Sequence, residues 1–122
     1  MPREEGETPY HEQFTEETIR RNLTSQGHSE ETISEVFELL QDRIPLFIDS
    51  IEQARASGEL SAMMSQAHAA KGVLNTIQLH ELAEQARNLE YAAKAGEAEK
   101  VTTIASTFVN SLRRLDDTLN DG

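Results

Sequence analysis

His68, Lys71 and Gly72 are the residues of this sequence whose types and spacing could carry chemistry. A neutral imidazole is a competent nucleophile near neutral pH, because its unperturbed pKa is about 6.5. It can accept a phosphoryl group on nitrogen, and such a group is labile enough to be passed to a carboxylate. Lys71 follows one helical turn later and can bring a positive charge to a phosphoryl oxygen. Gly72 lies on the same side and lacks the side chain that would block a bulky group.

The helix that must position these residues is expected over residues 59–77. On a helical wheel at about 100° per residue, His68 faces away from the apolar positions. A core histidine would lie among the apolar residues, so we expect His68 to project into solvent from the middle of the helix. The residues that share its side are Ser61, Met64, Ser65, Lys71, Gly72 and Asn75, and the apolar residues on the far side are Met63, Ala70, Val73, Leu74 and Ile77.

Apolar residues recur at the 3.6-residue period of amphipathic helices along most of the chain. Thr15 and Ser29 can act as N-caps, and each precedes two glutamates, which are favourable at the positive end of a helix. Pro45 interrupts the longest apolar stripe, so we expect it to kink that helix or to split it in two. Besides the helix at 59–77, helices are expected over about 15–25, 29–57, 79–95 and 97–119.

These helices and the absence of any strand pattern predict an all-α fold. Four amphipathic helices with short links indicate an antiparallel up-down-up-down four-helix bundle with an N-terminal accessory helix. Residues 1–28 are expected to form an acidic tail, flexible over 1–13, followed by the accessory helix. Residues 29–122 are expected to form the bundle. We expect a monomer, because one bundle accounts for the apolar stripes and a partner must reach His68.

Charge and composition exclude several classes of function. Eleven Lys and Arg residues against 22 Asp and Glu residues give a net charge of −11, which repels nucleic acid phosphates. There is no cysteine, so disulfides and cysteine-based metal sites are excluded. No apolar run approaches the roughly 18 residues of a membrane span, and the N-terminus lacks the apolar stretch of a secretory signal. We therefore expect a cytoplasmic protein that binds neither nucleic acid nor membrane.

Motifs for other chemistry are absent from the sequence. A di-iron carboxylate bundle would need a glutamate three residues before a histidine, and none of the four histidines has one. There is no His-Glu-x-x-His zinc motif and no nucleophile-elbow motif. We assign no role to His11, His28 or His80, and we expect no cofactor or metal bound by this chain.

A short segment around the histidine resembles the Ala-His-x-x-Lys-Gly motif of histidine-containing phosphotransfer (HPt) domains. The resemblance extends over roughly residues 33–119, although the family often has a glycine near the end of its histidine helix where this chain has none. That difference leaves the shape of the following turn open. The segments concerned are Ala67-His68-Ala69-Ala70-Lys71-Gly72 for the motif, Leu89-Glu90 and Ala95-Gly96-Glu97 for matching positions downstream, and Thr76-Ile77-Gln78 for the missing glycine.

The resemblance implies a phosphorelay intermediate. By this resemblance His68 accepts a phosphoryl group and passes it to or from the aspartate of response-regulator receiver domains. Lys71 is implied to supply charge beside the phosphoryl group, and Gly72 to leave clearance for the partner. The implied partners are receiver domains and a sensor histidine kinase, hybrid kinases included. Mg²⁺ is expected in the partner receiver domain and no cofactor in this chain. Nothing resembles a kinase ATP-binding domain, so a phosphocarrier rather than an enzyme is expected.

A different class of function also fits this sequence. A degenerate module of the same fold could dock a receiver domain without any phosphotransfer. The presence of His68, Lys71 and Gly72 argues against such degeneration. Incubation with a phosphorylated receiver domain discriminates the two interpretations, because only the relay protein takes up the phosphoryl group.

Overall fold

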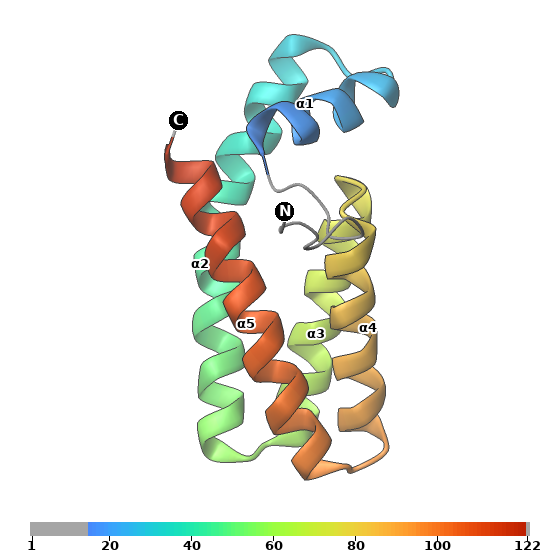
Figure 1. Ribbon diagram of the computed structural model, residues 1–122, viewed down its shortest axis with the longest axis vertical. Coiled ribbons are helices and arrows are strands. Elements are labelled where there is room, and N and C mark those ends of the chain that lie inside the picture. The colour runs from blue at the N-terminus through green and yellow to red at the C-terminus, as the bar shows by residue number, and fades with distance from the viewer. Residues whose placement is uncertain (1–14, 122) are drawn as a thin grey trace, which may run out of the picture.

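The computed structural model describes residues 15–121 of the 122-residue chain, so the tail predicted over residues 1–13 lies outside the described residues. The described part contains no strand, which confirms the all-α fold class, and none of its helices is long and apolar enough to span a membrane. Its helices, in chain order (Figure 1), are α1 (Glu16–Ser25), α2 (Glu30–Ser57), α3 (Leu60–Thr76), α4 (His80–Lys94) and α5 (Ala98–Asp121).

Side chains cap the first two helices where the sequence predicts them. The Thr15 hydroxyl accepts a hydrogen bond from the backbone N–H of Thr18 at 3.1 Å, and the Ser29 hydroxyl accepts one from the N–H of Thr32 at 3.2 Å. These bonds satisfy donors that the first turn of a helix leaves unpaired. Gly96 lies in the turn between α4 and α5. Its φ of 74° is in the left-handed region that glycine adopts readily.

α2 runs as one helix through Pro45, so the alternative that this proline splits the helix is wrong. A proline inside a helix removes one backbone donor and costs about 3 kcal/mol. Ile44 precedes the proline and Phe47 and Ile48 follow it, and all three are buried. Burial of these large apolar side chains against the other helices outweighs the local penalty, because each contributes about 1.5–3 kcal/mol.

The apolar stripes of α2 to α5 meet in one core. α3 packs mainly against α4, and α2 mainly against α5, with further contacts between α4 and α5 and between α2 and α3. Figure 1 shows these four helices lying side by side, with the chain turning back at each short connection. α1 joins the same core through Ile19 and Leu23, both fully buried. Burial of apolar surface is therefore shared by all five helices of the described part.

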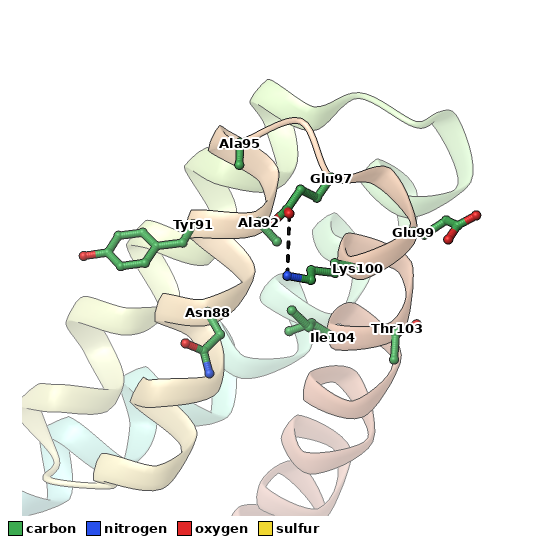
Figure 2. A pocket seen from close by; sticks show the side chains of 9 residues that line it. All are labelled: Asn88, Tyr91, Ala92, Ala95, Glu97, Glu99, Lys100, Thr103 and Ile104. Carbon is green, nitrogen blue, oxygen red and sulfur yellow. Dashed lines mark ion pairs between the residues drawn. The ribbon is translucent and has the colours of Figure 1, made fainter.

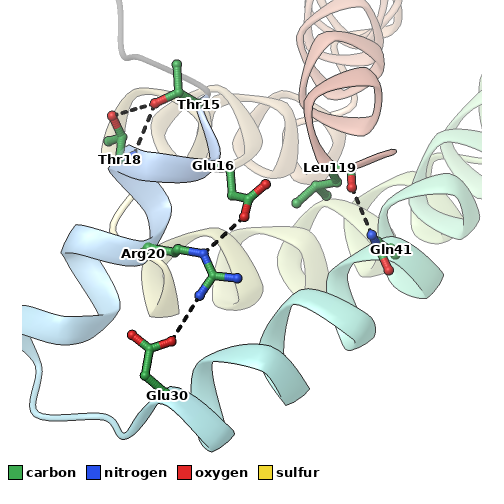
Figure 3. Close-up of polar contacts among 7 residues, drawn as sticks. All are labelled: Thr15, Glu16, Thr18, Arg20, Glu30, Gln41 and Leu119. Atoms are coloured by element: carbon green, nitrogen blue, oxygen red, sulfur yellow. Dashed lines mark hydrogen bonds and ion pairs between the residues drawn. The ribbon is translucent and has the colours of Figure 1, made fainter. Parts of the chain in front are cut away.

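Arg20 ties α1 to the beginning of α2. Its Nε lies 3.0 Å from Glu16 Oε2 and its Nη1 lies 3.3 Å from Glu30 Oε1 (Figure 3). The same guanidinium lies over the ring of Phe37, 4.8 Å from the ring centroid. A guanidinium suits this position because it can stack on an aromatic face and pair with carboxylates at the same time.

α1 also bonds to the end of the helix that carries His68. Nδ2 of Asn22 donates a hydrogen bond to the backbone oxygen of Ile77 at 3.1 Å, and Nε2 of Gln26 donates one to the backbone oxygen of Thr76 at 3.0 Å. The last carbonyls of a helix have no partner within the helix. α1 therefore completes the hydrogen bonding of α3 at its C-terminal end.

The turn between α3 and α4 takes its shape without glycine. Gln78 has a φ of 58° and is the one non-glycine residue of the described part with a positive φ. This left-handed conformation costs most residues about 1–2 kcal/mol. The N–H of Gln78 donates to the oxygen of Asn75, and the N–H of Leu79 donates to the oxygen of Leu74, each at 3.0 Å. These bonds close the end of α3 and hold Gln78 in its unusual conformation.

Candidate functional site

His68 lies in the middle of α3 with 68% of its side chain exposed. On the opposite side of the same helix, Met63, Ala67, Ala70 and Leu74 are buried. The side chain therefore projects into solvent, as the helical wheel predicts, and is open to a macromolecular partner.

Glu90 of α4 contacts both His68 and Lys71. Its Oε2 lies 2.9 Å from Nδ1 of His68, and its Oε1 accepts a hydrogen bond from Nζ of Lys71 at 2.9 Å. The side chains of Glu90 and Lys71 are only 17% and 26% exposed, because α3 and α4 pack closely along this line. Partial removal from water strengthens the attraction between the carboxylate and the ammonium group.

These contacts lower the pKa of the Glu90 carboxyl below its ordinary value. The hydrogen bond from Lys71 is the largest cause, burial acts in the opposite direction, and the contact with His68 adds to the lowering. Glu90 is therefore a carboxylate at neutral pH and can only accept hydrogen bonds.

The charge state of Glu90 determines which nitrogen of a neutral His68 carries the proton. Because Glu90 Oε2 can only accept, Nδ1 of His68 must be the donor in this contact. The lone pair of the neutral ring then lies on Nε2, the nitrogen that does not face Glu90. This nitrogen can act as a nucleophile toward an electrophile that approaches from solvent.

Gly72 lies inside α3 without any packing reason for a glycine. A Cβ built at this position would meet no heavy atom within 4 Å. Glycine in a helix interior costs about 1 kcal/mol relative to alanine, so the fold alone would favour a larger residue. The absence of a side chain leaves open surface on the solvent side of α3, four residues after His68.

The structure thus brings His68 and Lys71 together through Glu90, whereas Gly72 contributes only open space. Sequence reasoning noted Glu90 only as part of the family resemblance and gave it no role in the site, since it is 22 residues away from His68 in the chain. The signal that could have identified it is the short turn between two helices that pack against each other. Residues about equally far from such a turn lie side by side, and both His68 and Glu90 are about three helical turns from Gln78.

A groove of about 730 Å³ lies elsewhere, between α4 and the beginning of α5. Figure 2 shows Tyr91 and Asn88 on its α4 side, and an ion pair between Glu97 and Lys100 with Nζ and Oε2 3.5 Å apart. His68, Lys71, Gly72 and Glu90 are not among the residues that line it. The groove is therefore separate from the histidine site.

Comparison with protein families gives one match. The model of a family described as "Hpt domain" matches residues 35–120, which is more than half of the chain. The matched range contains α3 and α4 completely, together with His68, Lys71, Gly72 and Glu90. No curated protein and no solved structure matches the chain.

Proposed function

The chain belongs to the Hpt domain family, and from this premise we propose that it carries a phosphoryl group on His68 as an intermediate of a phosphorelay. Hpt domains act in histidine phosphotransfer within two-component systems, as phosphocarriers that interact with histidine kinases and response regulators. The matched range contains two histidines, His68 and His80. His80 is the first residue of α4, whereas His68 is exposed in mid-helix with its Nδ1 against Glu90. That contact is the observation that carries the assignment to His68.

The proposed step begins with the lone pair on Nε2 of His68. It attacks the phosphorus of an aspartyl phosphate in a receiver domain, so that an N–P bond forms and the P–O bond to the aspartate breaks. The aspartate leaves as a carboxylate, and the imidazole ring gains positive charge. Glu90 offsets this charge through the Nδ1–H hydrogen bond, as a carboxylate does behind a catalytic imidazole in hydrolases. The reverse step passes the phosphoryl group to the next receiver.

Lys71 and Gly72 complete the proposed site. The Lys71 ammonium supplies positive charge beside the phosphoryl oxygens, where charge-assisted hydrogen bonds are strong. Gly72 leaves the solvent side of α3 free for the surface of the receiver domain. Phosphoryl transfer depends mainly on positioning and charge stabilisation, and we assign the Mg²⁺ and the remaining groups to the receiver.

We further propose that α2 to α5 form the antiparallel up-down-up-down bundle expected of the family, with α1 as an accessory helix. Two contacts between α2 and α5 support this topology. Gln41 Nε2 donates to the backbone oxygen of Leu119 at 2.8 Å (Figure 3), and Arg113 Nη2 lies 3.4 Å from Glu52 Oε2. Residue numbers rise along α2 as they fall along α5, as two antiparallel neighbours require.

The proposed function is tested by incubating the protein with the receiver domains of the same organism, phosphorylated with labelled phosphate. We expect an acid-labile, base-stable label on the wild-type protein and none on His68→Gln. His80→Gln is the matched control and should take up label normally. If no receiver or kinase of that organism labels the wild-type protein, the relay proposal is wrong and the docking-only interpretation remains.

A further inference from the structure

Lys71 is already bound to an anion while His68 is unmodified. Its Nζ donates to Glu90 Oε1 at 2.9 Å, and the other oxygen of that carboxylate lies 2.9 Å from His68 Nδ1. Both partners of the ion pair are largely shielded from water, with exposed fractions of 26% and 17%. An ion pair of this kind is stronger than one on the open surface. The phosphoryl group must therefore compete with Glu90 for the lysine.

The geometry of the ring keeps the two anions apart. Nδ1 of His68 faces Glu90, so Nε2 and any phosphoryl group on it point away from that carboxylate. Lys71 lies one turn after His68 on the same helix and would have to swing from α4 toward solvent to reach the phosphoryl oxygens. A lysine side chain can do so, because its four-carbon stem is flexible and its three donors rotate freely.

We infer that Lys71 alternates between Glu90 and the phosphoryl group, and that this competition makes the phosphoryl group easier to pass on than it would be if the lysine had no other acceptor. In the unmodified protein Lys71 is bound to Glu90, and after phosphorylation it binds the phosphoryl oxygens. The inference deepens the proposed function and rests on it, because it requires the phosphoryl group to be on Nε2 of His68. Only the hydrogen-bond acceptor of Lys71 changes.

Glu90 can also act on the phosphohistidine without Lys71. Its charge and its hydrogen bond to Nδ1 stabilise the positive charge of the phosphorylated ring, and these effects oppose that of the competition for the lysine. A double-mutant cycle with Lys71 separates these direct effects from the competition for the lysine, because only the competition disappears when the lysine is absent.

The test measures how far His68 is phosphorylated by phosphoramidate, a small donor that needs no receiver domain. The P–N bond of phosphoramidate breaks, ammonia leaves, and an N–P bond to Nε2 forms. The ratio of phosphorylated to unmodified protein is measured by ³¹P NMR at fixed phosphoramidate and ammonium concentrations. The four proteins of the cycle are the wild type, Glu90→Gln, Lys71→Gln and the double variant.

We expect the effect of Glu90→Gln on the equilibrium constant for phosphorylation to be about tenfold more favourable with Lys71 present than in the Lys71→Gln background, since one charged hydrogen bond no longer has to be broken. In the Lys71→Gln background, the same change shows only the direct effects of Glu90 on the ring and should lower the equilibrium constant. Glu84→Gln makes the same charge change on the exposed side of α4 and is the matched control, with an expected change within about twofold. Thermal melts monitored by circular dichroism establish that each variant is folded.

Equal effects of Glu90→Gln with and without Lys71 would overturn the inference. If a variant fails to fold, a crystal structure of the phosphoramidate-treated wild type decides the matter. Lys71 Nζ should then contact a phosphoryl oxygen, and a lysine still bound only to Glu90 would contradict the inference. If receiver domains label His68 but the cycle shows no coupling between Glu90 and Lys71, the relay proposal stands and this inference alone is refuted. If the cycle shows this coupling but no receiver domain transfers a phosphoryl group to His68, only the relay proposal is refuted.

Discussion

Nδ1 of His68 lies 2.9 Å from Oε2 of Glu90, although 22 residues separate the two in the chain. The contact exists because α3 and α4 pack along each other on either side of a short turn. Together with the bond from Lys71, it makes Glu90 the residue through which the histidine and the lysine influence each other.

Glu90 should stabilise the fold in a pH-dependent way. Its pKa is lower in the folded protein than its ordinary value of 4.5. Its contribution is therefore complete above that value and is lost as pH falls through the lower folded pKa. Glu90→Gln should reduce the free energy of unfolding by about 1 kcal/mol at pH 7 and by progressively less toward pH 3. Thermal unfolding of both proteins across this range measures the difference in their free energies of unfolding. A difference that does not change with pH would contradict this role of Glu90. The free energy of unfolding of Glu84→Gln should differ much less from that of the wild type at pH 7.

Lys71→Ala should slow phosphoryl transfer without unfolding the protein. The ammonium group is proposed to stabilise charge on the phosphoryl oxygens, and removal of such a donor costs about tenfold or more in rate. Single-turnover transfer from a phosphorylated receiver measures the rate, and circular dichroism measures the helix content. Lys100→Ala removes an exposed lysine on α5 and should leave the rate unchanged. Loss of helix content in Lys71→Ala would mean that Lys71 serves the fold rather than the reaction.

Substitutions of Gly72 should separate its effect on the stability of the fold from its effect on the access of a receiver domain to His68. Gly72→Ala should stabilise the protein by about 1 kcal/mol, because the position is helical and a Cβ there meets no atom within 4 Å. Gly72→Gln should remain folded but slow transfer from a receiver domain, which needs the open surface. Phosphorylation by phosphoramidate should be almost unaffected, since that donor is small. Ser106→Gln places the same side chain at an exposed position of α5 and should affect neither donor. Equal slowing with both donors would show that Gly72 does not act through clearance.

Gln78→Gly should stabilise the protein by about 0.5–1 kcal/mol, because glycine adopts a φ of 58° at little cost. Gln53→Gly is the matched control in the right-handed backbone of α2 and should destabilise by about 1 kcal/mol. Urea unfolding compares the two variants. A destabilised Gln78→Gly protein would show that the glutamine side chain, rather than its backbone conformation, matters at this turn.

Local signals predicted most of the helices, because caps and the apolar period act over a few residues. Thr15 and Ser29 placed the beginnings of α1 and α2, and Gly96 placed the turn after α4. What sequence reasoning missed depends on tertiary contacts. Pro45 remains helical because of burial around it, and Glu90 joins the site through packing between α3 and α4.

Other expectations stay predictions. They are the division of the chain after residue 28, the monomeric state, the cytoplasmic location, and the roles of His68, Lys71 and Gly72. The oligomeric state, the location and the roles of these residues depend on partners or surroundings outside the folded chain.

The bonds from Asn22 and Gln26 to the end of α3 have a practical consequence for fragments of this protein. The family match begins at residue 35, whereas the first buried apolar residue of the described part is Ile19. A fragment trimmed to the matched range would lose Ile19 and Leu23. The apolar surface that these two side chains cover would then be exposed to water. Exposed surface of that kind promotes self-association, so a trimmed fragment should self-associate more readily than the longer chain.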